Sequence, residues 1–166
     1  MPLTEGESAV RSQPVLKPGD DRSLADVWLR AWGVACARVI LGLLFGMRGW
    51  DKVFNMTPVV HASRFFTGAY ADTWIPQWLL WITGVTIPFV ELTAGWLLVV
   101  GWRTRDAVIG LGLVLMLVTY GHMLANPLFN DVIVFTRLVL LVCVAMVPRD
   151  TDRLSLDYWL SRRRTR

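Results

Sequence analysis

The sequence predicts an all-α integral membrane protein, namely an antiparallel, up-and-down four-helix bundle with both termini in the cytoplasm. Three observations predict this fold class: 54% of the 166 residues are hydrophobic, only 18% are charged, and the mean hydropathy is +0.46. Soluble domains usually contain about 25% charged residues. The composition therefore indicates a chain that lies in lipid, and the length fits a single domain.

Four apolar stretches are long enough to cross a hydrocarbon core about 30 Å thick, which takes about 20 helical residues. They are residues 31–50, 75–101, 106–124 and 129–147. Helices satisfy their own backbone hydrogen bonds in lipid, and these stretches are too long for barrel strands. The short connection between the last two stretches predicts a helical hairpin. The sequence therefore predicts four transmembrane helices.

The segments outside the spans are predicted to be of three kinds. We expect residues 1–27 to be a disordered cytoplasmic segment, residues 28–148 to be the transmembrane domain, and residues 149–166 to be a basic cytoplasmic tail. The tail includes a short helix that lies along the inner membrane surface. The outer connection, residues 51–74, is longer than a turn requires. It is either a plain interfacial connector or a short amphipathic helix that covers a site.

The distribution of basic residues predicts the orientation. With four spans, both termini and the connection between the second and third spans share one side, which holds twelve Lys and Arg residues, whereas the other side holds Lys52 and Arg64. The positive-inside rule places the richer side in the cytoplasm. We therefore expect a multi-pass protein of a bacterial-type cytoplasmic (inner) membrane. The twelve are Arg11, Lys17, Arg22, Arg30, Arg103, Arg105, Arg149, Arg153, Arg162, Arg163, Arg164 and Arg166.

Three charged side chains fall near the middle of the predicted spans: Arg38, Glu91 and Arg137. Each costs at least about 2.5 kcal/mol at mid-membrane. The helical rise puts all three roughly 12–15 Å above the inner boundary, so we expect Glu91 to lie between the two guanidinium groups. Two interpretations stay open. The cluster locks the helices, with an arginine on carbonyls that Pro88 leaves free, or it binds a quinone carbonyl or an anion while Glu91 exchanges a proton.

A second polar group is predicted at the outer ends of the spans. Its members are Arg48, Asp51, Lys52, Tyr120, His122 and Asp131. The unperturbed pKa of histidine is about 6.5, so His122 can take up or release a proton near neutral pH. The two cations beside it would attract an anionic substrate. The alternative is that His122 is an ordinary hydrogen-bonded surface residue.

Motifs for other cofactors and partners are absent from the sequence. Cys36 and Cys143 form no Cys-x-x-Cys pair and are predicted to be small packing residues. We expect no metal, because the two histidines lack a cluster of companions, and no haem, flavin or nucleotide motif is present. The net charge of +4 comes from residues that flank apolar segments, so we expect no nucleic acid. Gly42-x-x-x-Gly46 predicts close helix packing, within the bundle or between protomers.

Two segments, residues 37–54 and 91–105, combine an intramembrane charge with glycines that are followed by a basic residue. This pattern resembles the DoxX/DoxD superfamily of small four-helix membrane proteins, and the likeness covers about residues 34–147. Arg48 departs from the pattern, because the superfamily usually has a histidine there. The positions that carry the resemblance are Arg38, Gly42, Gly49, Lys52, Glu91, Gly95, Gly101, Arg103 and His122.

The resemblance implies a four-helix bundle. For the best-known members it also implies a subunit of thiosulfate:quinone oxidoreductase, which passes electrons from thiosulfate to membrane quinone. We therefore expect a subunit of a quinone-linked redox system, with quinone as its cofactor. The alternatives are a non-catalytic accessory or assembly subunit of a larger membrane complex, and a small-molecule transporter.

The redox hypothesis gives each candidate residue a role. Glu91, His122 and Arg48 are the candidate catalytic residues, and the other two sets overlap with them. We expect the lipid bilayer and either partner membrane subunits or further copies of the chain as partners. The quinone would contact Arg38, Arg137 and Glu91, and the substrate would contact Arg48, Lys52 and His122.

Overall fold

The computed structural model describes residues 21–125, 132–148 and 152–164, and it is all-α over these ranges. Three helices are long and apolar enough to cross a membrane, and a shorter apolar helix follows them. The prediction of a helical membrane protein is therefore confirmed. The long helices are α1 (Asp21–Trp50), α3 (Gln77–Val100) and α4 (Thr104–Ala125), the shorter one is α5 (Val132–Ala145), and α6 (Leu156–Arg164) lies in the C-terminal segment.

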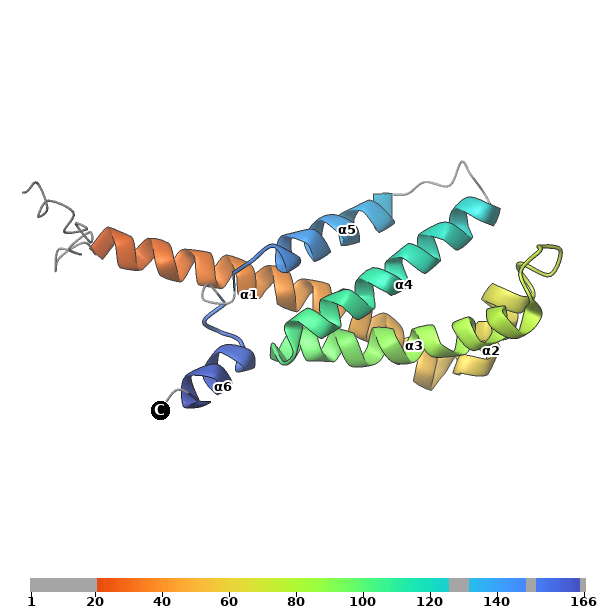
Figure 1. Ribbon diagram of the computed structural model, residues 1–166, viewed down its shortest axis with the longest axis horizontal. Coiled ribbons are helices and arrows are strands. Elements are labelled where there is room, and N and C mark those ends of the chain that lie inside the picture. The colour runs from red at the N-terminus through yellow and green to blue at the C-terminus, as the bar shows by residue number, and fades with distance from the viewer. Residues whose placement is uncertain (1–20, 126–131, 149–151, 165–166) are drawn as a thin grey trace, which may run out of the picture.

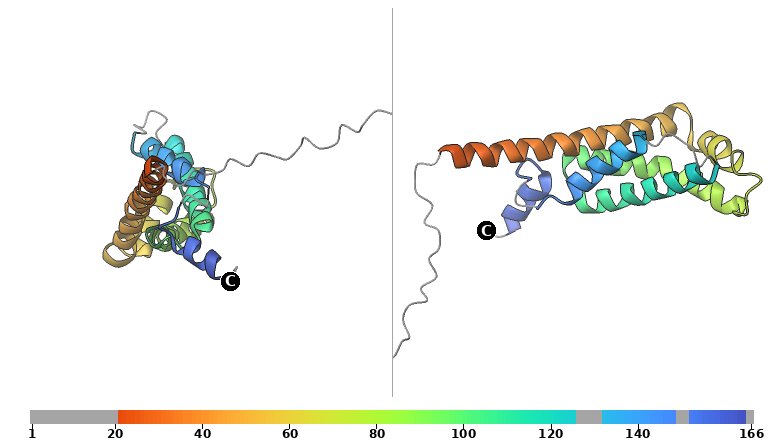
Figure 2. Two further views of the ribbon diagram at one scale, coloured as in Figure 1. Left: turned by 90° about the vertical axis from the view of Figure 1, so that its left-hand side faces the viewer. Right: turned by 90° about the horizontal axis from the view of Figure 1, so that it is seen from above.

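The four apolar helices pack as a ring of neighbours. Helix α1 contacts α3 and α5, and α4 contacts the same two helices from the other side. Successive apolar helices run in opposite directions, as the colours of Figure 1 show, and the N-terminal end of α1 projects beyond the other helices (Figures 1 and 2). Helix α6 lies near the end of the ring where α3 ends and α4 begins.

Two segments outside the predicted spans are helical. Helix α1 begins at Asp21, ten residues before the predicted span, because residues 21–30 continue the same helix. The disorder expected of residues 1–27 is therefore wrong for residues 21–27, and residues 1–20 lie outside the described residues. The outer connection is also largely helical, since a π-helix η1 (Asp51–Asn55), a short helix α2 (Pro58–Ala62) and a second π-helix η2 (Ser63–Thr67) follow α1 and pack along α3.

Helices α1 and α3 approach so closely that side chains cannot fit between them. A Cβ atom on Gly95 of α3 would lie 2.3 Å from the backbone nitrogen of Gly46, and one on Gly49 would lie 2.3 Å from the backbone nitrogen of Leu92. Gly42 also packs against α3, with its Cβ position 2.7 Å from the carbonyl oxygen of Gly95. The predicted Gly42-x-x-x-Gly46 contact therefore lies within one chain, between α1 and α3.

An apolar core fills the ring next to the C-terminal half of α3. Phe45 and Leu41 of α1 are fully buried there, against small and branched residues of the other three helices. The remaining members of this core are Ala94, Leu98, Ala107, Val108, Leu111, Leu115, Leu141 and Val144. Because close-packed cores hold their helices in one register, this core fixes where the charged side chains of the neighbouring turns lie.

The segment before α6 closes the end of the ring at which α4 begins. Gly101 ends α3 in the left-handed conformation, with φ 76°, and its N–H bonds the carbonyls of Leu97 and Leu98. The carboxylate of Asp157 in α6 accepts hydrogen bonds from the backbone N–H groups of Arg103 and Thr104, at 2.9 and 3.0 Å. A residue that is distant in sequence thus caps the N-terminus of α4.

Candidate functional site

The structure separates the three charged residues that the sequence places at one level. The expectation that Glu91 lies between Arg38 and Arg137 is wrong, because each of the three binds a different partner. All three are buried, with 2%, 3% and 7% of Arg38, Glu91 and Arg137 exposed. Counting a fixed rise per residue along each helix did not predict which of these charges are neighbours. The reason is that α1 extends well past the end of α3, so the helices are offset from one another along their length.

Glu91 forms a buried ion pair with Lys52. The Lys52 Nζ donates to Glu91 Oε2 at 2.6 Å, and only 4% of the Glu91 side chain and 23% of the Lys52 side chain are exposed. The close approach at Gly49 brings the last turn of α1 and η1 over the Glu91 turn of α3. Arg48 is exposed and adds an electrostatic interaction with Glu91. The resulting pair joins two helices and neutralises the carboxylate.

Arg38 binds the C-terminal end of α3. Its Nη1 donates to the carbonyl of Leu98 and, at 3.1 Å, to that of Val99. The last carbonyls of a helix lack hydrogen-bond partners within the helix and form the negative end of its dipole. A guanidinium at this position donates to those carbonyls and interacts favourably with the dipole. Nη2 donates to the carbonyl of Leu154 at 3.4 Å, and Nε lies 3.2 Å from the carboxylate of Asp152. Arg38 therefore ties α1 and α3 to the C-terminal segment.

Asp152 is the second half of this inner junction. Burial raises the pKa of its carboxyl above the usual range, and the nearby Asp157 carboxylate acts in the same direction, while the positive charge of Arg38 opposes both. Ser155 beside it is also buried and caps α6, since its hydroxyl accepts from the N–H of Tyr158 at 3.2 Å. Nothing in the local sequence distinguishes Asp152 from the other charges of the tail, so it could not be predicted as a site residue from the sequence.

Arg137 lies in the middle of α5 against an aromatic ring of α1. Its guanidinium carbon is 5.6 Å from the centre of the Phe45 ring, a distance typical of a cation–π contact. Its Nη2 is buried and has no hydrogen-bond partner in the described part of the chain. Of the three expected cluster members, Arg137 is thus the least satisfied.

His61 has a role that the sequence did not suggest. Pro88 has no N–H, so the carbonyl of Gly84, four residues earlier in α3, lacks its helical hydrogen bond. The Nδ1 of His61 lies 2.8 Å from that carbonyl oxygen and supplies the missing donor. Burial lowers the pKa of His61, with a smaller opposing effect from the hydrogen bond and a lowering effect of the Lys52 charge.

The same contact explains the place of α2. His61 is 5% exposed, and a Cβ on Gly84 would lie 2.7 Å from the Cα of Ala62, so α2 packs directly on α3. The rings of Phe65 and Phe66 flank His61, with ring centres 5.5 and 5.6 Å from that of the histidine. A glycine four residues before a proline, within a span, was the available signal. The sequence interpretation assigned carbonyls freed by Pro88 to an arginine, which is wrong for the carbonyl of Gly84.

Two of the residues expected at the outer site, Lys52 and His122, have partners close by. Lys52 is engaged with Glu91 and is not free to attract an anion. His122, in the last turn of α4, has its Nδ1 2.7 Å from the carbonyl of Val118 in its own helix. The roles in catalysis and anion binding that were expected of Arg48 and His122 stay predictions.

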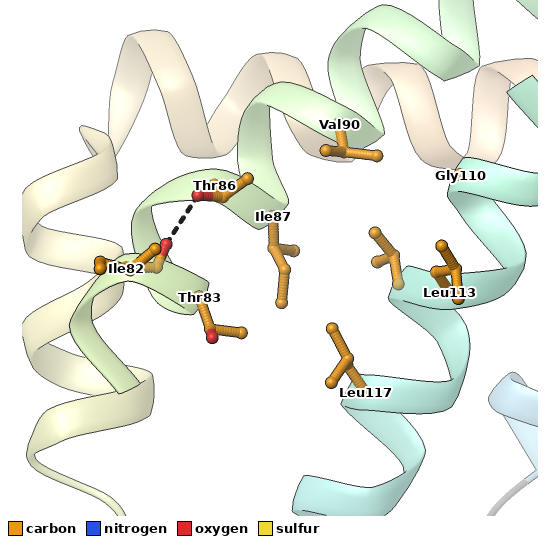
Figure 3. Close-up of a pocket in the computed structure, with 9 residues that line it drawn as sticks. Ile82, Thr83, Thr86, Ile87, Val90, Gly110, Leu113 and Leu117 are labelled. Atoms are coloured by element: carbon orange, nitrogen blue, oxygen red, sulfur yellow. Dashed lines mark hydrogen bonds between the residues drawn. The ribbon is translucent and has the colours of Figure 1, made fainter. Parts of the chain in front are cut away.

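A groove between α3 and α4 has a volume of about 310 Å³ (Figure 3). Its two threonines are Thr83 and Thr86, and the hydroxyl of Thr86 donates to the carbonyl of Ile82 in its own helix at 2.7 Å. No charged side chain lines this groove, so it adds no acid, base or cation to the site. The other lining residues are apolar: Ile82, Ile87, Val90, Gly110, Leu113, Val114 and Leu117.

The described residues offer no ready metal site. Within 21–125, 132–148 and 152–164, no group of three or more His, Cys, Asp or Glu side chains is placed to hold a metal ion. Cys36 and Cys143 are both exposed free thiols on the apolar helices. The expected absence of a metal stays a prediction.

Comparison with known proteins identifies a family for most of the chain. Residues 30–134 match the model of a DoxX-related membrane family described as "Methylamine utilisation protein MauE". The match includes Arg38, Lys52, His61 and Glu91, whereas Arg137 and the residues that follow it lie beyond the matched range. No curated protein and no solved structure matches the chain.

Proposed function

The chain belongs to the MauE family of DoxX-related membrane proteins, and we propose that it is a membrane component of the apparatus for methylamine utilisation, with an accessory rather than a catalytic role. The observation that carries the accessory role is the Lys52–Glu91 ion pair. The carboxylate expected to exchange protons binds an ammonium of the same chain at 2.6 Å and is almost fully buried. Such a pair fixes the position of one helix on another.

The same reasoning applies at the other end of the ring. Arg38 is engaged by carbonyls of α3 and by the C-terminal segment, so its charge serves the assembly of the chain itself. We therefore propose the accessory role in preference to the quinone-linked redox subunit that the sequence suggested. The family description refers to methylamine and does not mention thiosulfate. The role in quinone binding that was expected of Arg137 stays a prediction.

The proposed placement in the membrane has four spans, with α5 as the fourth, in a bacterial-type inner membrane. It rests on the alternating directions of the apolar helices and on the excess of Lys and Arg at one end. Both termini are then cytoplasmic, and α2 with the neighbouring π-helices faces the outer side. Many of the large apolar side chains of α1, α3, α4 and α5 are exposed, which leaves them available to lipid and to partner subunits.

Growth on methylamine tests the proposal. Bacteria that use methylamine and lack this chain should fail to grow on it, and the native chain should restore growth. The paired variant Lys52→Met/Glu91→Leu removes both charges while keeping apolar volume, so an accessory subunit should still restore growth. If the paired variant accumulates in the membrane to the native level and growth is not restored, the carboxylate has a chemical role and the accessory proposal is wrong.

A further inference from the structure

The end of α1 and the beginning of η1 lie deep inside the proposed membrane span. Gly49 packs against α3 at Leu92, since a Cβ atom on Gly49 would lie 2.3 Å from the backbone nitrogen of Leu92. At the helical rise per residue, Leu92 is about 12 Å from the inner end of α3 and about 22 Å from its outer end. The residues on either side of Gly49 therefore lie at the level of the middle of α3.

Charged and aromatic side chains mark the two boundaries of this span. Arg103 and Asp106 form an exposed ion pair at the turn between α3 and α4, so this end stays at the aqueous surface. Trp78 and Trp81 are exposed near the other end of α3, and tryptophan is enriched at membrane interfaces. From Trp81 to Gly101 the helix rises about 30 Å, which is the thickness of a hydrocarbon core. The region around Gly49 is thus near the bilayer centre.

Three polar side chains at this depth face outward. Arg48, Asp51 and Asn55 are exposed, and the amide of Asn55 donates to the Asp51 carboxylate at 2.8 Å. Neither Arg48 nor Asp51 belongs to an ion pair among the described residues. Arg48 interacts electrostatically with Glu91, but that carboxylate is already bound by Lys52. Charged residues within membranes almost always face protein or water and pair with one another. A single chain would leave both charges facing lipid, so another molecule must cover them.

We infer that this face of α1 and η1 binds the same face of a second copy of the chain. The face carries one positive and one negative charge, and a two-fold axis along the membrane normal sets each against its opposite. Arg48 pairs with the partner subunit's Asp51, at a height difference of about 4.5 Å that an arginine side chain spans. Ile40 and Leu44, 50% and 37% exposed, continue the face toward the inner side.

The balance of charge on this face favours a second copy over other occupants. Lipid chains supply neither charge at this depth, whereas two identical faces satisfy each other without any charge from outside the chain. Helix α1 lies along one edge of the helix ring in the right-hand view of Figure 2, which leaves its outer side open to a partner. The inference rests on the four-span placement proposed above and is independent of the accessory role.

Disulfide cross-linking in native membranes tests the interface. In a Cys36→Ala/Cys143→Ala background, Leu44→Cys should give a covalent dimer of twice 18.8 kDa when the membranes are oxidised with copper phenanthroline. Ile109→Cys is the matched control, because Ile109 is exposed on α4 at a similar height above the inner boundary. It should give at least tenfold less dimer.

Exchanging the charges tests whether they hold the dimer together. Arg48→Asp leaves two acidic positions on the face and Asp51→Arg leaves two basic ones, so each variant alone should lose at least nine-tenths of the dimer that Leu44→Cys forms. When the two variants carry different tags and are produced in the same cells, they should pair with each other and restore cross-linking. This rescue also shows that both variants fold.

Three results would overturn the inference. They are the absence of a dimer from Leu44→Cys, equal cross-linking from Ile109→Cys, and cross-linking of Leu44→Cys to a protein of another mass. A dimer that survives Arg48→Asp unchanged would likewise contradict the pairing of Arg48 with Asp51. Maleimide labelling of cysteines placed at Asp72 and Arg103 checks the membrane placement separately, so a wrong placement and a wrong partner give different results.

Discussion

The places of Arg38, Glu91 and His61 are explained by the groups that lie within one side-chain length of each. Arg38 reaches the carbonyls at the end of α3, Lys52 reaches Glu91 because glycines let two helices approach, and His61 reaches the carbonyl that Pro88 leaves free. Water cannot replace a missing partner in lipid, so a buried charge depends on hydrogen-bond acceptors or counter-ions of the protein itself.

The Lys52–Glu91 pair should show strong coupling in a double-mutant cycle. Glu91→Leu leaves the Lys52 ammonium without its counter-ion and should lower the free energy of unfolding by about 3 kcal/mol. The double variant Lys52→Met/Glu91→Leu should recover most of that loss, because it leaves no unpaired charge. Unfolding in mixed detergent micelles measures the four free energies. Losses that add without coupling would show that the pair contributes nothing to helix packing.

His61 should make stability depend on pH. Its pKa is lowered in the folded chain, so the folded state favours the neutral ring. The stabilisation is complete above the unfolded pKa of about 6.5 and is lost as the pH falls through the lower folded pKa. The free energy of unfolding should therefore fall as the pH is lowered through this range.

Asparagine at position 61 is the informative comparison for that pH dependence. Its amide can donate to the carbonyl of Gly84 from nearly the same position as Nδ1, but it does not titrate. The difference in unfolding free energy between His61→Asn and the native chain should therefore vary with pH below 6.5 and be constant above it. His122 is present in both proteins and cancels in the difference. A difference that is flat across the whole range would contradict the role of His61.

At the scale of elements, the contact between α1 and α3 is the most constrained in the molecule. It depends on three glycines of α1 and one of α3, and the backbones meet where side chains are absent. Arg38 precedes the glycines of this contact along the chain and Lys52 follows them. A shift of one helix along the other would therefore break both the Lys52–Glu91 ion pair and the bonds of Arg38 to the end of α3. Helix packing and charge pairing are therefore coupled.

Two glycine-to-alanine substitutions test this contact. Gly95→Ala places a methyl group against the backbone of Gly46 and should cost about 1–3 kcal/mol or more of unfolding free energy, as overpacking usually does. Gly33→Ala is the matched control, since nothing lies within 4 Å of its added methyl, and it should gain up to about 1 kcal/mol from helix propensity. Thermal unfolding of both variants gives the comparison, and equal effects would argue against the close contact.

At the scale of the whole molecule, the charged ends and apolar sides determine how the chain sits in the bilayer. The exposed side chains of the four apolar helices are mostly large and hydrophobic, and the basic residues gather at the end that carries α6. The inner junction of Arg38, Asp152 and Asp157 fastens the C-terminal segment to that end. The segment is therefore part of the fold rather than an appended tail.

Cysteine labelling tests the orientation. In a Cys36→Ala/Cys143→Ala background, a cysteine at Asp72 should react with a membrane-impermeant maleimide in intact cells. A cysteine at Arg103 should react only after the membrane is opened, because the positive-inside rule places that turn in the cytoplasm. Both positions are exposed in the folded chain, so burial does not account for a difference. The reverse labelling pattern would invert the proposed topology.

The sequence by itself determined the membrane class, the helical fold and the burial of three charged residues inside the spans, because composition and the length of the apolar stretches depend directly on the lipid solvent. Arg38, Glu91 and Arg137 were all correctly predicted to lie inside. Only the tertiary structure decided their partners. Pairing depends on the offset between helices, which is set by glycine contacts and core packing between residues far apart in the chain. A residue-by-residue rise along separate helices contains no information about that offset.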